Sequence, residues 1–171
     1  MLAGLTCAVF VPVLVAITGC GRTGDARAGE GQTASADLVQ AGPAFVQANY
    51  ATPQMPAVAV TVLFTTAQSA GNLNVVVVGW NDTTASVASV SDTTGNGYVQ
   101  AVGPTAQPGA ITQSIYYAKS IGAAAAGANV VTVTFTTPAQ FADVRVLEYS
   151  GIDPVNPLDV VASGTGSAAT S

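Results

Sequence analysis

The sequence contains no histidine among its 171 residues, and only 8% of its side chains are charged. The missing histidine excludes Ser-His-Asp and Cys-His catalysis, an imidazole base near neutral pH and every histidine-ligated metal site. Four Lys and Arg against nine Asp and Glu give a formal net charge of -5. Because binding to a phosphate backbone depends on clustered basic side chains, the composition excludes nucleic acid as a partner.

The first 21 residues carry no charged side chain, and residues 8–18 form a compact apolar run. The run has the length of the hydrophobic region of a signal peptide. Pro12 interrupts it before it is long enough to span a membrane. It differs from the usual signal in having no Lys or Arg before it. We predict a signal peptide at residues 1–19 and export of the protein.

Directly after the apolar run, Ile17, Thr18, Gly19 and Cys20 resemble the lipobox of bacterial lipoproteins. In that family the cysteine is acylated and becomes the first residue of the mature chain. The resemblance implies a lipid on Cys20 and a membrane as the partner of that lipid. Gly21 stands where an Asp would favour the inner membrane, which favours the outer membrane or the cell surface. The alternative is an ordinary signal peptide and a secreted protein.

The segment after Cys20 is rich in Gly, Ala and small polar residues and poor in large apolar ones. Such a composition buries too little surface to offset the entropy of ordering, so residues 20–43 are predicted to be a flexible tether. Residues 163–171 have a similar composition and are predicted to be a disordered tail or linker. The only other cysteine, Cys7, lies in the predicted signal, so the body has no disulfide.

Residues 44–162 are predicted to form one all-β domain, a β-sandwich of the jelly-roll or Ig-like type with eight to nine strands. The strands are indicated by period-2 alternation and by apolar runs between turn residues. The four-valine run in 73–80 is typical of a central strand that is covered on both faces. Asn96-Gly97 favours a tight hairpin between 87–92 and 98–102. The expected strands are 45–50, 58–65, 73–80, 87–92, 98–102, 111–118, 130–137, 142–150 and a weak 158–162.

Four runs in this body resemble a poorly characterised family of secreted bacterial β-sandwich modules. They are residues 72–82, 90–98, 114–119 and 147–153. The family has no agreed activity, so the resemblance supports fold and location more than function. Its members continue with further strands, which implies that the chain is truncated.

Two loops contain the candidate binding residues. Trp80 ends the valine strand and meets the polar residues Asn81 and Asp82, where its ring would either stack on a ligand or close the end of the sandwich. Asp92 and Asn96 are the candidate ligands of a structural calcium ion, the one cofactor considered, with Asp82 as a further guess. The alternative role of both aspartates is to bind the backbone of their own turns.

Glu148 is the most informative acid, because alternation places it on one face with Val144 and Val146. If that face is the core, Glu148 requires a partner, and Lys119 is one of only two basic residues in the body. Alternatively, Glu148 and a second acid such as Asp153 would serve a glycan-active hydrolase.

Taken together, the sequence predicts a non-enzymatic, surface-anchored or secreted lipoprotein. Its β-sandwich would be a binding or adhesion module, with cell-wall or extracellular glycan as the ligand class considered. A purely structural spacer in a larger surface protein and a fragment of a glycan-active hydrolase are the alternatives.

Overall fold

The computed structural model describes residues 42–107 and 109–166. Within them the chain forms eight strands and no helix, which confirms the predicted all-β fold. The strands are β1 (Ala44–Ala51), β2 (Ala57–Leu63), β3 (Leu73–Trp80), β4 (Val87–Asp92), β5 (Val99–Gln107), β6 (Ile111–Ala118), β7 (Val130–Ala139) and β8 (Asp143–Ser150). The predicted signal, Cys20, and all but the ends of the predicted tether and tail lie outside the described residues.

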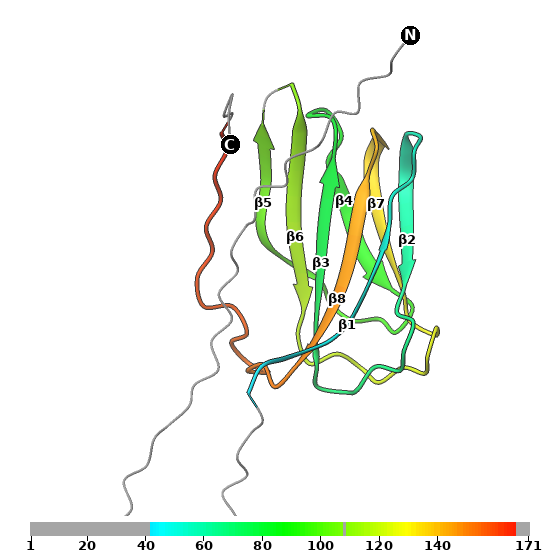
Figure 1. Cartoon of the computed structure of the whole chain (residues 1–171), viewed down its shortest axis with the longest axis vertical. Helices are drawn as coiled ribbons and strands as arrows, with labels where there is room; N and C mark the ends of the chain where they lie inside the picture. The colour runs from blue at the N-terminus through cyan, green and yellow to red at the C-terminus, as the bar shows by residue number, and fades with distance from the viewer. Residues whose placement is uncertain (1–41, 108, 167–171) are drawn as a thin grey trace, which may run out of the picture.

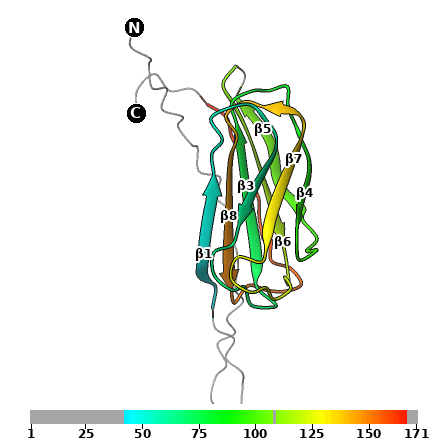
Figure 2. The same cartoon turned by 90° about the vertical axis from the view of Figure 1, so that its right-hand side faces the viewer.

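The strands form two antiparallel sheets that face each other as a sandwich (Figures 1 and 2). One sheet has the order β1-β8-β3-β6-β5, and the other has the order β2-β7-β4. The pairs β1–β8, β2–β7 and β3–β6 are nested, as expected when one long antiparallel hairpin is rolled up. These three pairs are those of a jelly roll rather than those of an immunoglobulin domain, but the fourth nested pair, β4–β5, is absent because β5 joins β6 in the other sheet.

The core between the sheets is made largely of valine, because alternate residues of β3, β7 and β8 face inward. Val76 and Val146 are register partners and are both fully buried. The outward face of β3 is also apolar. Pro157 and Leu158 close a cavity of about 20 Å³ against Leu73 and Val75. The prediction of a central strand is thus confirmed, whereas the outward face is covered only in part, since Val75 and Val77 are half-buried.

The predicted hairpin at Asn96-Gly97 is wrong. β4 pairs only with β7, whereas β5 pairs with β6 in the opposite sheet, so the connection crosses the sandwich. The turn itself lies one residue earlier, where Gly95 has a φ of 79° and its N–H donates to the Asp92 carbonyl. The Asn96 side chain and backbone are both bound by the Asp92 carboxylate, which directs the chain away from β4.

Residues 158–162 and strand β5 depart from regular strand structure. Residues 158–162 form no strand, so the weak ninth strand was wrongly predicted. β5 is irregular because its register with β6 shifts twice. Gly103 lies at one of these shifts with a φ of 109°, and a Cβ there would approach the Gln113 carbonyl oxygen to 2.7 Å. Only glycine fits this close approach of two strands.

Candidate functional site

Trp80 lies in the core at the end of the sandwich where β3 ends. Its side chain is 2% exposed, its indole N–H donates to the Ala85 carbonyl at 3.2 Å, and its ring packs edge-to-face on Phe135. A ring in this position has no face open to a sugar. Two roles were considered for Trp80. Its burial is incompatible with stacking on a ligand and agrees with the other role, which is to close the end of the sandwich.

Asp82 joins two loops at the same end. One carboxylate oxygen accepts the backbone N–H groups of Thr84 and Ala85 at 2.9 and 2.7 Å, and the other accepts that of Gln140 at 2.9 Å. Burial raises the pKa of Asp82, but these hydrogen bonds outweigh it and hold the pKa below its usual value. The neighbouring Asn81 is exposed, and its N–H donates to the Gln140 carbonyl. Asp82 has the turn-binding role that was the alternative to ligand binding.

Asp92 lies at the opposite end of the sandwich, and its carboxylate is occupied by hydrogen-bond donors. It accepts bonds from the Asn96 N–H at 2.9 Å, the Asn96 amide at 2.7 Å, and Tyr98 and Asn129 at 3.0 Å each. One carboxylate oxygen accepts three of these bonds and the other accepts the Asn96 N–H, so a cation at Asp92 would compete with hydrogen bonds that the fold already makes. The Asn96 side-chain oxygen in turn accepts the Gly122 N–H. The calcium site predicted at Asp92 and Asn96 is therefore replaced by a hydrogen-bonding role.

No group of three or more Asp, Glu, His or Cys side chains suitable for a metal occurs within 42–107 and 109–166. Instead, Asp92 belongs to a closed ring of hydrogen bonds that we call the polar ring. Asp92 binds Tyr98, Tyr98 binds Asn74, Asn74 binds Gln68, Gln68 binds Asn129, and Asn129 returns to Asp92. Because its members come from both sheets and the loops between them, the polar ring closes this end of the sandwich.

Acid should weaken the polar ring through Asp92. Burial raises the pKa of Asp92, but the hydrogen bonds from Asn96, Asn129 and Tyr98 outweigh it and keep the pKa lowered. The pKa of Asp92 is therefore lower in the folded protein than in the unfolded chain, where it is about 3.9. The stabilisation by the ionised carboxylate is complete above the unfolded pKa and is lost as the pH falls through the folded pKa. Asp92→Asn should cost about 1–3 kcal/mol at pH 7 and flatten this acid limb.

The free energy of unfolding of the unchanged protein and of Asp92→Asn is measured by urea unfolding from neutral pH to about pH 2.5. Asp82, whose pKa is also lowered, should leave the variant with some residual slope. Equal slopes for the two proteins would contradict the role given to Asp92.

Glu148 is fully buried on the inner face of β8, one inward position beyond the valines. One carboxylate oxygen accepts the Gln47 amide at 2.6 Å, and the other accepts the Asn72 amide at 2.6 Å and the Ser69 N–H at 3.4 Å. Lys119, the partner considered for it, instead donates to the Val155 carbonyl. Burial of Glu148 is confirmed, but its partners are amides from β1 and the β2–β3 loop.

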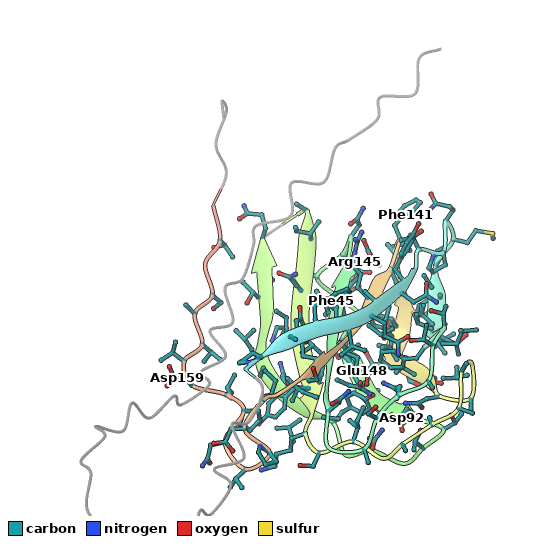
Figure 3. The ribbon with its side chains drawn as sticks, turned by 60° about the horizontal axis from the view of Figure 1, so that its bottom comes forward. Phe45, Asp92, Phe141, Arg145, Glu148 and Asp159 are labelled. Atoms are coloured by element: carbon teal, nitrogen blue, oxygen red, sulfur yellow. The ribbon has the colours of Figure 1, made fainter. Side chains whose placement is uncertain are left out.

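This burial conflicts with a hydrolase that uses Glu148. A glycosidase needs two carboxyl groups facing the same glycosidic bond, and a side chain that is 0% exposed faces none. The second acid considered, Asp153, binds the backbone N–H groups of Val155 and Asn156 in its own turn. These backbone bonds hold the pKa of Asp153 below its usual value. Figure 3 shows Glu148 and Asp92 at one end of the sandwich, with Arg145 and Phe141 toward the other.

An exposed cluster of larger side chains lies elsewhere, on the outer face of the five-stranded sheet. We call it the β1–β8 face and define it by Phe45, Ala48 and Tyr50 of β1 and by Asp143, Arg145, Leu147 and Tyr149 of β8. Tyr50 is 63% exposed, and the Arg145 guanidinium lies over its ring, 5.6 Å from the centroid. Arg145 also pairs with Asp143 at 2.9 Å, and this bond raises the pKa of Arg145.

The β1–β8 face is hollowed beside Tyr50. A shallow depression of about 370 Å³ is lined by Ala48, Asn49, Tyr50, Arg145 and Leu147. Further along the strands, Phe45 is 60% exposed and packs edge-to-face on Tyr149 at 5.9 Å. Exposed aromatic rings beside paired charged groups are suited to ligands that combine a flat apolar surface with hydroxyl groups.

Sequence reasoning did not single out these aromatic residues as candidate site residues. The signal that identifies them was nevertheless present in the alternation of β8. With Val144, Val146 and Glu148 facing inward, Arg145 and Tyr149 must face outward. Alternation does not give the register between strands, so the position of Tyr50 beside its register partner Arg145 is known only from the structure.

Among the residues that the structure describes, no helix has the length and apolar character needed to cross a membrane. Comparisons of the chain with protein families, curated proteins and solved structures found no match.

Proposed function

We propose that the protein is an exported lipoprotein, anchored through Cys20, whose β-sandwich is a non-catalytic binding module. Its ligand site would be the β1–β8 face, and carbohydrate is the ligand class that its chemistry favours. The observation that carries this proposal is the exposure of Tyr50 and Phe45 on one sheet face, next to the Arg145–Asp143 pair.

A binding role is favoured over hydrolysis because the acids are engaged in the fold. Asp82, Asp92 and Asp153 accept backbone N–H groups of their own turns, and Glu148 is buried under amide donors. Each of these carboxylates would have to give up structural hydrogen bonds in order to act on a substrate. An exposed aromatic surface requires no such change.

Carbohydrate is favoured because a sugar ring has an apolar face and a rim of hydroxyl groups. The Tyr50 ring offers a surface for the first, and the Asp143 and Arg145 groups supply an acceptor and donors for the second. Jelly rolls also occur in lectins, which is an analogy of fold and adds little by itself.

Tyr50→Ala should abolish or strongly reduce ligand binding without unfolding the protein. Loss of a central exposed aromatic anchor should weaken binding at least about tenfold. The loss of stability should stay within about 1 kcal/mol, because the contact with Arg145 is exposed. The measurement is binding of the full chain to bacterial surfaces and to a glycan array.

Leu63→Ala provides the matched control, since Leu63 is a large side chain, 42% exposed, on the other sheet. It should bind like the unchanged protein. If the unchanged protein binds neither surface, the binding module is wrong and the structural spacer is favoured. If Tyr50→Ala and Leu63→Ala bind equally well, the ligand site is not on the β1–β8 face.

The lipid anchor predicts the location of a Cys20→Ser variant. Without a thiol to acylate, the unprocessed precursor should accumulate, and the mature membrane-bound form should disappear. Cell fractionation and labelling with a radioactive fatty acid measure the two forms, with Cys7→Ser as the matched control that should be processed normally. A Cys20→Ser protein that stays membrane-bound, with no precursor accumulating, would contradict the anchor.

A further inference from the structure

The β1–β8 face has two aromatic positions rather than one. The first is Tyr50 with Arg145 over its ring, and the second is Phe45 packed against Tyr149. In each position the two residues come from neighbouring strands, because Tyr50 is the register partner of Arg145, and Phe45 that of Tyr149. Both positions are therefore fixed by the same strand pairing and face the same side of the sheet.

The two positions lie far apart for one small ligand. Arg145 and Tyr149 are four residues apart on β8, which corresponds to about 13 Å along the strand. A single sugar ring does not reach across this distance, whereas a short stretch of a linear chain does. Between the positions lie Ala48 and Leu147, which are opposite each other in register and form part of the floor of the hollow beside Tyr50.

The charge of the face restricts the type of chain. β1 contains no charged residue, and the outward charged residues of β8 are Asp143 and Arg145, which neutralise each other at 2.9 Å. A strongly anionic polysaccharide would meet the Asp143 carboxylate without a surplus of positive charge to compensate. The face is thus complementary to a chain of neutral sugars, whose hydroxyl groups both donate and accept hydrogen bonds.

From these observations we infer that the β1–β8 face binds a linear, neutral polysaccharide that lies along β8 and contacts Tyr50 and Phe45 with different sugar units. This inference rests on the proposed function, because it specifies the ligand of the same site. It adds a requirement that a site for a single sugar does not have, namely dependence on chain length.

The test uses the full chain and a panel of neutral polysaccharides, namely glucans, mannans, xylans and chitin oligosaccharides, each beside its own disaccharide. Affinity gel electrophoresis and titration calorimetry give the association constants. For a polymer that binds, the disaccharide should bind at least about tenfold more weakly. Tyr50→Ala and Phe45→Ala should each weaken polymer binding about tenfold.

The double variant sharpens the test. Sites more than about 10 Å apart that share no contact are close to additive, so the two changes together should weaken polymer binding about a hundredfold. Leu63→Ala serves as the control for an exposed apolar side chain, and polygalacturonate serves as the acidic polymer. Thermal unfolding should show that all variants remain folded, since Phe45 and Tyr50 are mostly exposed.

The outcomes separate this inference from the function on which it rests. Equal binding of polymer and disaccharide, or a Phe45→Ala variant that binds normally, overturns the two-position site and leaves a single-sugar site at Tyr50. Preference for polygalacturonate overturns the neutral ligand. Binding to cells that Tyr50→Ala abolishes, with no glycan bound, overturns the carbohydrate inference and indicates a protein partner, while the binding module stands.

Discussion

Glu148→Gln should lower the free energy of unfolding by about 2–4 kcal/mol, although the two side chains have nearly the same shape. Both oxygens of Glu148 accept amide N–H groups, from Gln47 on one side and from Asn72 on the other. Glutamine replaces one of these acceptors with a donor. Whichever way the new amide points, one pair of N–H groups would face each other in a fully buried place.

The neighbours have limited freedom to relieve this conflict. The Gln47 side-chain oxygen accepts the Thr66 N–H at 3.0 Å, which fixes its amide with the N–H group toward Glu148. Turning the Gln47 amide over would remove that bond and place its oxygen where it meets the Thr66 carbonyl, to which its N–H now donates. Turning the Asn72 amide over instead would still leave the Ser69 N–H, which now donates to Glu148 at 3.4 Å, facing a donor.

Asp159→Asn is the matched control, because it makes the same chemical change at an exposed carboxyl group. It should alter stability by no more than about 0.5 kcal/mol. Urea unfolding at neutral pH measures both variants. A Glu148→Gln protein as stable as the Asp159→Asn protein would show that the buried carboxylate is not needed as a double acceptor.

Trp80→Ala should lower the free energy of unfolding by about 3–5 kcal/mol, the range for truncating a buried tryptophan. The substitution removes the edge-to-face contact with Phe135 and leaves the Ala85 carbonyl without its indole donor. It also opens the end of the core where β3 ends. Thermal and urea unfolding give the size of the loss.

The control for Trp80 is Phe141→Ala, which removes an aromatic side chain that is 50% exposed. Its effect on stability should be close to that of an ordinary surface change, about 0.5 kcal/mol. Under conditions where the Trp80→Ala protein is still folded, that protein should still bind ligand through the β1–β8 face. Selective loss of binding without loss of stability would return Trp80 to the role of a ligand platform.

The positions of the strands follow from local pattern, and this part of the fold could be predicted. Alternation along 111–118 and 87–92 gives the limits of β6 and β4 as the structure has them. The central place of β3 in its sheet follows from its unbroken run of valines. What alternation leaves open is which sheet each strand joins, because strands of both sheets have one inward and one outward face.

The hairpin at Asn96-Gly97 was wrongly predicted because local pattern does not show which sheet the next strand joins. The dipeptide favours a tight turn locally, but the Asp92 carboxylate binds Asn96 and Tyr98, and this chain of contacts leads across the sandwich. The polar ring was equally out of reach, because Asn129 and Gln68 are 61 residues apart and meet only in the folded chain. Exposure of Tyr50 required knowing that β1 is at the edge of its sheet.

The two carboxylates at opposite ends of the sandwich have a consequence for how the domain is closed. Asp82 connects the loop after β3 to the turn before β8, and Asp92 connects the end of β4 to the start of β7. These are connections that many small secreted proteins make with disulfides. Residues 42–166 contain no cysteine, so both ends close without an oxidant or an isomerase. The folded domain is therefore equally suited to reducing and oxidising surroundings.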